Sequence, residues 1–345
     1  MTEIEEKNVN ENPIGFNYVE GPVIVYKGFD KDFCCHGKQY EIGKSYHTDG
    51  DVRSLSEGFH GFIRATDAIM IYKSEVCSRF AVVELSGTVG KYSDDFYSAS
   101  DMKIIEEIDL PGLMNIVSLA SKYRKIKLAK RDKYFFSFDY AIKENDALPL
   151  TLSNKKIYVN GRNSWLSLTG EGCEVMLDEG SVVSSMGLSQ KISSIAVEAK
   201  VMTSGSFGRL ESYGERANLC NMGNFNKMFV AGDSTLLLNS GNSCSLVSTG
   251  KDINISDYGF GTFIAFSGDN ASLFTAGKAA HILSTGDNSR IVVTGYDTFV
   301  DCFGKNTVIA VIGKRCVVRT KDWTDVTFVG VQADFGKSCK KTKQS

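Results

Sequence analysis

Thirteen glycines recur at intervals of nine residues between Gly205 and Gly313. Only 33 of the 345 residues are glycine, so chance does not produce this spacing. The fifth residue after each of these glycines is aliphatic, and the third is nearly always small. The register extends back to about residue 161, with one residue dropped after Gly170, which gives roughly eighteen units over 161–321.

A nine-residue unit is too short for a pair of packed helices, because helical repeats need 30 or more residues. The third, fifth and seventh positions of each unit point the same way only in a strand. The pattern therefore predicts a parallel β-solenoid, with one short strand and one corner per unit. We favour two units per coil over three, and we assign the repeated glycine to a corner with positive φ. The expected core residues include Leu237, Leu246, Ile264, Ile282, Ile291 and Ile309.

Composition divides the chain near Pro149, because all four prolines lie at or before this residue. The fold class expected is mainly β, with a small α+β domain followed by the solenoid. The expected parts are a disordered segment 1–20, an α+β domain 21–150 with a helix near 112–131, a solenoid 151–330 and a disordered basic tail 331–345. Interior strands of a parallel stack need every N–H group, which explains the absence of proline after Pro149.

The solenoid has apolar residues at outward positions of alternate units. We interpret them as a partner-binding surface, a self-association surface or the place where the N-terminal domain docks; the alternative is an aromatic ladder without a partner. The residues expected to bind a partner are Phe229, Val247, Phe263, Leu283, Phe299 and Val317.

Several classes of ligand are not expected. The net charge of −2 and the mixed signs argue against nucleic-acid binding. The units lack the G-G-x-G-x-D pattern of calcium-binding nonapeptides, so no calcium is expected. Adjacent Cys34, Cys35 and His36 have a poor spacing for tetrahedral zinc, and we expect no metal and no cofactor. There is no apolar run of 18 residues and no signal-peptide pattern, and nine cysteines without C-x-x-C are typical of reduced thiols in a cytoplasm.

The N-terminal part carries the strings YKGFDKDFCCHGKQYEIGKSYHTDG (26–50), EGFH (57–60) and SRFAVVELSG (78–87). These strings resemble a family of unknown function encoded by phages and prophages, in which YKGFD, YExGK and GFH motifs precede an array of nonapeptides. The resemblance implies no particular activity. Together with the apolar outward residues and the absence of a catalytic set in the repeat, it favours a non-enzymatic phage or prophage accessory protein in the cytoplasm of a bacterial host. We expect such a protein to bind a host protein and so counter or modulate host defence, or to self-associate.

Two other functions are open at this point. The same N-terminal strings are loosely similar to ADP-ribosyltransferase-like folds, and an enzyme of that kind would use Tyr26, His60, Tyr72 and Glu84 around a nicotinamide dinucleotide. The third hypothesis is a phage structural or fibre accessory protein, since solenoids form rigid rods. The repeat region has no clustered carboxylates and no Ser/His/Asp set, so we expect no catalytic centre on the solenoid.

Overall fold

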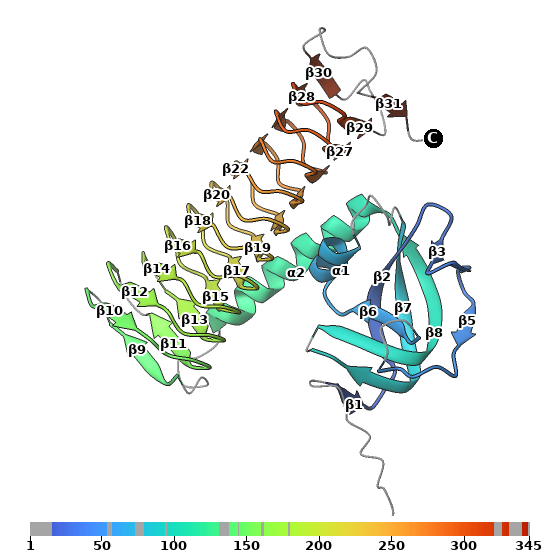
Figure 1. Ribbon diagram of the computed structural model, residues 1–345, viewed down its shortest axis with the longest axis horizontal. Coiled ribbons are helices and arrows are strands. Elements are labelled where there is room, and N and C mark those ends of the chain that lie inside the picture. The colour runs from blue at the N-terminus through green and yellow to red at the C-terminus, as the bar shows by residue number, and fades with distance from the viewer. Residues whose placement is uncertain are drawn as a thin grey trace, which may run out of the picture. The chain divides into compact units, whose positions relative to one another are not determined.

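The computed structural model describes residues 16–53, 57–72, 79–93, 95–130, 138–143, 145–159, 162–178, 180–320, 326–330 and 340–343. The chain divides into two compact units, one ending at Leu113 and the other beginning at Met114 (Figure 1). The described residues contain two helices and are otherwise mainly strands, which confirms the expected fold class. The expected disordered segment 1–20 lies mostly outside the described residues, although Asn17–Val19 forms strand β1.

The first unit is built on a six-stranded antiparallel sheet of order β1-β7-β2-β6-β8-β5. Its strands are β1 (Asn17–Val19), β2 (Val23–Phe29), β5 (Ser45–His47), β6 (Phe59–Phe62), β7 (Arg79–Lys91) and β8 (Phe96–Ile108). Because β7 also pairs with β8, the strands β7, β2, β6 and β8 form a closed ring. The small hairpin of β3 (Cys34–Cys35) and β4 (Lys38–Gln39) and the short helix α1 (Ala65–Ile71) complete the unit. Buried Val25, Phe29, Val83, Leu85 and Ile104 belong to its core.

Helix α2 (Leu110–Lys130) occupies the region where a helix near 112–131 was expected. Asp109 caps its start, since the Asp109 carboxylate accepts a hydrogen bond from the Gly112 amide at 2.8 Å. From Met114 onward the helix belongs to the second unit. There the hydroxyls of Ser121 and Thr249 lie 3.3 Å apart, so α2 contacts the solenoid just after β21 (Ser245–Ser248).

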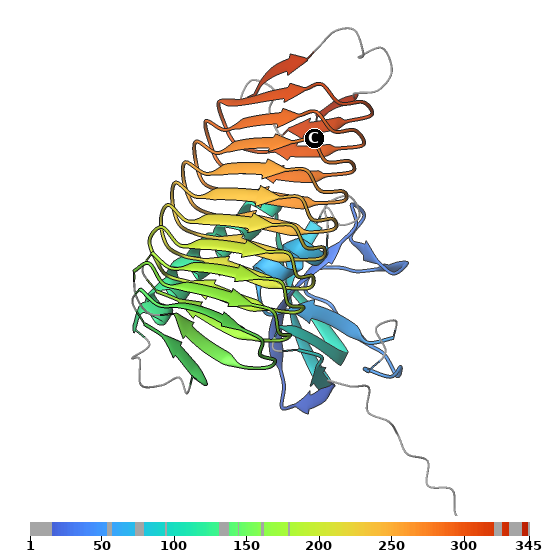
Figure 2. The ribbon, with the colours of Figure 1, turned by 60° about the vertical axis from the view of Figure 1, so that its left-hand side comes forward.

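The second unit is a parallel β-solenoid of about ten turns between residues 140 and 320 (Figure 2). One of its two sheets has twelve strands: β9 (Tyr140–Ile142), β11 (Lys156–Val159), β13 (Glu174–Leu177), β15 (Lys191–Ser194), β17 (Arg209–Ser212), β19 (Lys227–Val230), β21, β23 (Phe263–Phe266), β25 (His281–Ser284), β27 (Phe299–Cys302), β29 (Val317–Thr320) and β31 (Lys340–Lys343). The other has eleven: β10 (Ala147–Leu150), β12 (Trp165–Leu168), β14 (Val182–Ser185), β16 (Lys200–Thr203), β18 (Asn218–Asn221), β20 (Leu236–Asn239), β22 (Asn254–Asp257), β24 (Ser272–Thr275), β26 (Arg290–Val293), β28 (Thr307–Val311) and β30 (Val326–Gly330).

Successive repeats alternate between the two sheets, so each coil contains two repeats. Ile264 pairs with Ile282 in one sheet, and Leu273 pairs with Ile291 in the other, both 18 residues apart. This register confirms the two-unit coil. Trp165 pairs with Val182, only 17 residues on, which reflects the residue dropped after Gly170. The core residues expected from the sequence, Leu237, Leu246, Ile264, Ile282, Ile291 and Ile309, all lie in one buried cluster with 0% exposed surface.

The solenoid begins at Tyr140, earlier than the expected start near residue 151. The first coil escaped a search based on glycine because Leu152 stands where later coils have glycine. Strand β10 is the first of its sheet, and it contains Pro149. An edge strand tolerates proline, whereas an interior strand does not.

The repeated glycines have a different role from the one expected. The residue with positive φ is two positions later, for example Arg216 (φ 54°), Ser234 (φ 55°) and Asn270 (φ 59°). At the repeated position a Cβ atom would collide with the preceding coil: one added to Gly268 would lie 1.6 Å from the carbonyl oxygen of Gly250. The assignment of these glycines to positive φ is therefore wrong, and close stacking of the corners is the physical reason for them.

The end of the array lies partly outside the described residues. In the segment 331–345, expected to be a disordered tail, the structure describes Lys340–Lys343 as strand β31, which pairs in parallel with β29. Residues 331–339, 344 and 345 are not among those described.

Candidate functional site

The structure brings together two of the four residues proposed for an ADP-ribosyltransferase-like site. The Tyr72 hydroxyl donates a hydrogen bond to the backbone oxygen of His60 at 3.4 Å, and the His60 ring stacks on Phe96 with centroids 5.7 Å apart. His60 is 7% exposed, so its ring is part of a packed aromatic group. Tyr26 and Glu84 are half-buried on the paired strands β2 and β7.

Lys27 lies beside this pair, and the sequence analysis did not single it out. Its side chain is 4% exposed, and its ammonium donates to the backbone oxygen of His60 at 3.2 Å. Burial alone lowers the pKa of Lys27, but the nearby Tyr72, Cys35 and Tyr40 side chains outweigh it and raise the pKa above its usual value.

The glycine of the YKGF string has a packing role at this place. A Cβ atom on Gly28 would lie 2.4 Å from Cβ of Tyr72, so only glycine lets the end of α1 approach β2 this closely. A glycine inside a strand often marks a place where another segment approaches closely, so Gly28 could have indicated this contact from the sequence. The contacts of Lys27, Gly28, His60 and Tyr72 together describe a packed junction between β2, β6 and α1.

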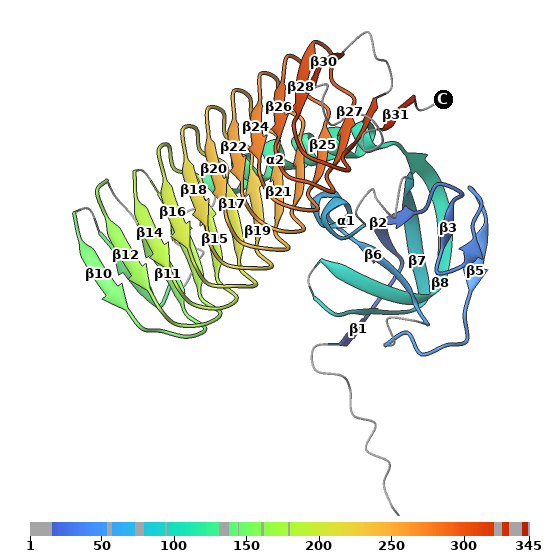
Figure 3. The same cartoon turned by 45° about the horizontal axis from the view of Figure 1, so that its top comes forward.

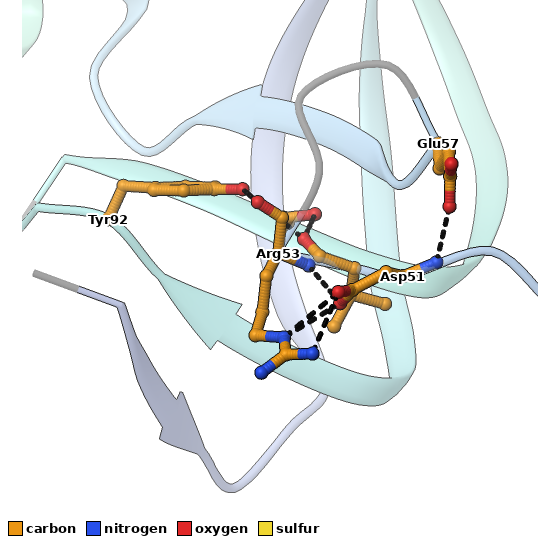
Figure 4. Close-up of polar contacts among 6 residues, drawn as sticks. Asp51, Arg53, Glu57 and Tyr92 are labelled. Carbon is orange, nitrogen blue, oxygen red and sulfur yellow. Dashed lines mark hydrogen bonds and ion pairs between the residues drawn. The ribbon is translucent and has the colours of Figure 1, made fainter. Parts of the chain in front are cut away.

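A polar network joins Asp51, Arg53, Glu57 and Tyr92 (Figure 4). The Asp51 carboxylate accepts hydrogen bonds from the Arg53 guanidinium at 2.9 and 3.0 Å, and these bonds hold the pKa of Asp51 below its usual range. The Glu57 carboxylate accepts the Asp51 amide at 2.8 Å, and the Tyr92 hydroxyl donates to the Arg53 carbonyl. Each of the two carboxylates thus has a hydrogen-bond partner among residues 51–53.

On the solenoid, the six predicted partner-binding residues lie on the outward side of the twelve-stranded sheet. Four of them are buried: Phe229, Val247, Phe263 and Leu283 have exposed fractions of 6%, 0%, 1% and 0%. Phe299 and Val317 are half-buried. The middle of this surface is thus buried.

Buried charges accompany these apolar side chains on the same side of the sheet. The Arg319 guanidinium donates two hydrogen bonds to Asp301, at 2.5 and 2.7 Å, and His281 Nε2 lies 3.2 Å from the same carboxylate. Burial raises the pKa of Asp301, but the bonds from His281 and Arg319 outweigh it and lower the pKa. Glu211, 3% exposed, is paired with Arg209 at 2.6 Å. Such paired, buried ions are typical of a packed interior surface.

Nine large apolar residues with exposed side chains lie at the corners that lead from the eleven-stranded to the twelve-stranded sheet. Figure 3 shows the coils that these corners belong to, for example the one that joins β18 to β19. We call this set of nine residues the apolar edge; its members are 45–62% exposed. They are Met186, Leu188, Phe207, Met222, Phe225, Tyr258, Phe260, Tyr296 and Ile312.

The opposite corners form a polar edge. Between residues 186 and 312, Val197 is the one large apolar residue exposed there among those described. The Asp233 carboxylate accepts the Lys251 amide at 2.7 Å, and Asp287 accepts the Lys305 amide at 2.7 Å, so the acidic residues bond to the next coil. The contrast between the edges has an 18-residue period, and an analysis in units of nine averages the two edges together. The sequence analysis separated alternate repeats only at the outward positions of the strands, and the same separation at the corner positions would have revealed the contrast.

No metal site is found in the described part of the chain, where no group of three or more His, Cys, Asp or Glu side chains could hold an ion. Cys34 in the Cys34-Cys35-His36 string donates to the Gln39 side-chain oxygen at 2.9 Å. In the same described residues, no helix has both the length and the apolar character needed to cross a membrane.

Comparison with known proteins gives one match, to a family model that covers most of the N-terminal unit. Residues 23–116 match the family model of a domain of unknown function, DUF7666. No curated protein and no solved structure matches the chain. The matched segment contains the strands β2 to β8 and the start of α2, and so covers the strings that carried the resemblance.

Proposed function

We propose that this protein is a non-enzymatic interaction protein whose solenoid binds a host protein or a second copy of the chain. The single observation that carries this proposal is the apolar edge. Large exposed apolar groups gathered in one place mark interaction surfaces on soluble proteins. Seven steps of about 4.8 Å from β14 to β28 make this edge roughly 34 Å long, which suits an ordinary protein interface.

The backbone of the corners strengthens the proposal. Phe207 and Phe225 have φ angles of 61° and 58°, a left-handed conformation that costs a residue with a Cβ about 1 kcal/mol. At the matching position of the polar edge stand Ser234, Asn270 and Asn288, of which asparagine suits this conformation. The two phenylalanine rings stack with centroids 5.1 Å apart and planes at 5°. Turn geometry does not favour phenylalanine there, so contact with a partner is a physical reason for it.

The biological setting belongs to the same proposal. The motif resemblance favours a phage or prophage origin and action in the cytoplasm of the bacterial host, where binding would counter or modulate a host defence protein. In this proposal the surface that meets the partner is the apolar edge. The buried residues around Phe263 and Leu283 instead pack within the chain.

The test replaces Phe207 and Phe225 with asparagine in the full-length protein. Because asparagine suits positive φ, we expect unchanged or slightly higher thermal stability together with loss of binding. Self-association is measured by light scattering on a sizing column. Host binding is measured by capture from a bacterial lysate, followed by titration of the purified captured protein.

The matched control changes the same corner position on the polar edge, Arg216→Asn with Ser234→Asn. This control loses the exposed ion pair of Arg216 with Glu198 but should keep the self-association and the host-protein capture of the wild type. Loss of self-association in the Phe207/Phe225 variant assigns the edge to a second copy, and loss of a captured protein assigns it to a host partner. Equal behaviour of the two double variants would refute a role for the apolar edge.

A further inference from the structure

Three aromatic rings of the first unit surround one ammonium group. Lys38 Nζ lies 5.1 Å from the ring centroid of Phe59, 5.2 Å from that of Tyr46 and 5.9 Å from that of Tyr40. Each distance is within the range of a cation–π contact, for which about 6 Å is the limit. We call Tyr40, Tyr46 and Phe59 the aromatic cage.

The walls of the aromatic cage are fixed by the fold. Tyr40 and Phe59 are each 6% exposed and belong to the core of the unit. The Tyr40 and Tyr46 rings meet edge to face with centroids 4.8 Å apart. The Tyr46 hydroxyl accepts the Glu41 amide at 2.7 Å, which fixes the orientation of the third ring. The cage is therefore formed before any cation arrives.

The Lys38 side chain is held far less firmly in the aromatic cage than the three rings that form it. Lys38 is exposed and lies on β4, one of the two-residue strands of the hairpin with β3. A lysine ammonium is strongly hydrated and its long side chain has many rotamers, so it loses solvation and entropy when it stays against rings. An alkylated ammonium keeps the charge but holds water less tightly, and aromatic cages are a recurrent means of binding such groups.

We propose that the aromatic cage is a binding site for an alkylated ammonium group, and that Lys38 is an internal occupant which such a group displaces. The ligand is either a small quaternary ammonium compound or the methylated lysine side chain of a protein. This site lies in the first unit, and it is independent of the apolar edge and of the function proposed for it.

The experiment titrates tetramethylammonium into the full-length protein and follows the single proton signal of the probe by NMR. Because Lys38 competes for the cage, we expect weak binding to the wild type and about tenfold tighter binding to Lys38→Ser. In the Lys38→Ser background, Tyr46→Phe should retain binding because it keeps the ring. Tyr46→Leu should lose most of it.

Two further comparisons test whether the positive charge is needed and whether the natural ligand is a free compound or a protein side chain. Choline is compared with 3,3-dimethylbutan-1-ol, which has the same shape without the charge; only choline should bind. A short peptide with trimethyllysine is compared with choline: tighter binding of the peptide assigns the ligand to a protein side chain, and tighter binding of choline to a free compound.

The proposal is overturned if Lys38→Ser keeps the thermal transition of the wild type but shows no saturable binding of tetramethylammonium. Equal binding of the neutral alcohol would also overturn it, because the site would then be merely apolar. Equal binding by the Tyr46→Phe and Tyr46→Leu variants would exclude the cage as the place of binding.

Discussion

The two sheets of the solenoid are made from the same nine-residue unit, yet their outward sides differ. In the twelve-stranded sheet, Val247, Phe263 and Leu283 are buried, and α2 contacts the corner beside β21. In the eleven-stranded sheet, Leu236 and Leu238 remain 44% and 36% exposed. An apolar residue at an outward position is thus buried in the middle of the twelve-stranded sheet but exposed in the eleven-stranded sheet.

The inward sides of the two sheets differ as well. On the eleven-stranded side a polar ladder of Asn221, Asn239, Asp257 and Thr275 runs through the core, with bonds of 2.7, 2.8 and 3.0 Å between successive side chains. Each of its members also bonds to the amide of the repeated glycine that follows, as Asn221 does to Gly223 at 3.1 Å. On the twelve-stranded side the matching positions include Val230 and Phe266. The comparison shows that one repeat supports two kinds of packing once it alternates between two sheets.

The largest effect is expected from a charge in the shared core. Ile282→Asp places an unpaired carboxylate where the side chain has 0% exposed surface, and should cost more than about 4 kcal/mol and unfold the array. The control Leu238→Asp, at an exposed position, should change little. Circular dichroism melts measure both, and an unchanged melt for Ile282→Asp would contradict its placement.

The next effect tests the stacking that both sheets share. Gly268→Ala brings a Cβ atom to 1.6 Å from the Gly250 carbonyl oxygen, so we expect a loss of about 3 kcal/mol or more in urea unfolding. Gly261 has φ +65° and its nearest neighbour atom is 3.8 Å away, so Gly261→Asn should stay within about 0.5 kcal/mol. Similar losses for both variants would contradict close stacking of the corners as the reason for the repeated glycines.

A matched pair of leucines tests the comparison directly, since Leu283 and Leu238 occupy the same position of their repeats in opposite sheets. Leu283→Glu should cost about 2–3 kcal/mol, because its side chain has no exposed surface. Leu238→Glu should stay within about 0.5 kcal/mol. If the two variants were equally stable, the outward side of the twelve-stranded sheet would be open to a partner, as the sequence interpretation had it.

The smallest effect concerns the polar ladder. Burial raises the pKa of Asp257 and outweighs the hydrogen bonds from Asn239 and Thr275, so the folded state binds its proton more tightly than the unfolded state. Stability from this group is therefore full below the ordinary pKa of 3.8 and is lost as the pH rises through the higher folded pKa. At neutral pH, the free energy of unfolding of Asp257→Asn should exceed that of the wild type by up to about 1 kcal/mol. This difference should vanish in acid. Urea unfolding at several pH values measures the difference, and a gain that is independent of pH would exclude the titration of Asp257 as its cause.

The sequence by itself determined the solenoid, its two-repeat coil and its line of aliphatic core residues. The reason is that the same local requirements recur in every repeat. Every ninth residue stacks closely against the corner of the preceding coil, and the side chains of every strand alternate between the core and the outward side. Glycine at 268 and isoleucine at 282 satisfy these needs without knowledge of any distant residue. The segment that matches DUF7666, residues 23–116, contains the YKGFD and GFH strings.

Which apolar residues are exposed to solvent, and which aromatic rings contact one another, could be determined only from the tertiary structure. The exposure of Phe207 and the burial of Phe263 depend on what lies over each coil, and the nonapeptide pattern carries no information about that. Tyr40, Tyr46 and Phe59 are spread over 20 residues and converge on Lys38 only because the hairpin folds back on the sheet. A local repeat specifies packing along the chain, whereas a surface or a cage depends on contacts between distant segments.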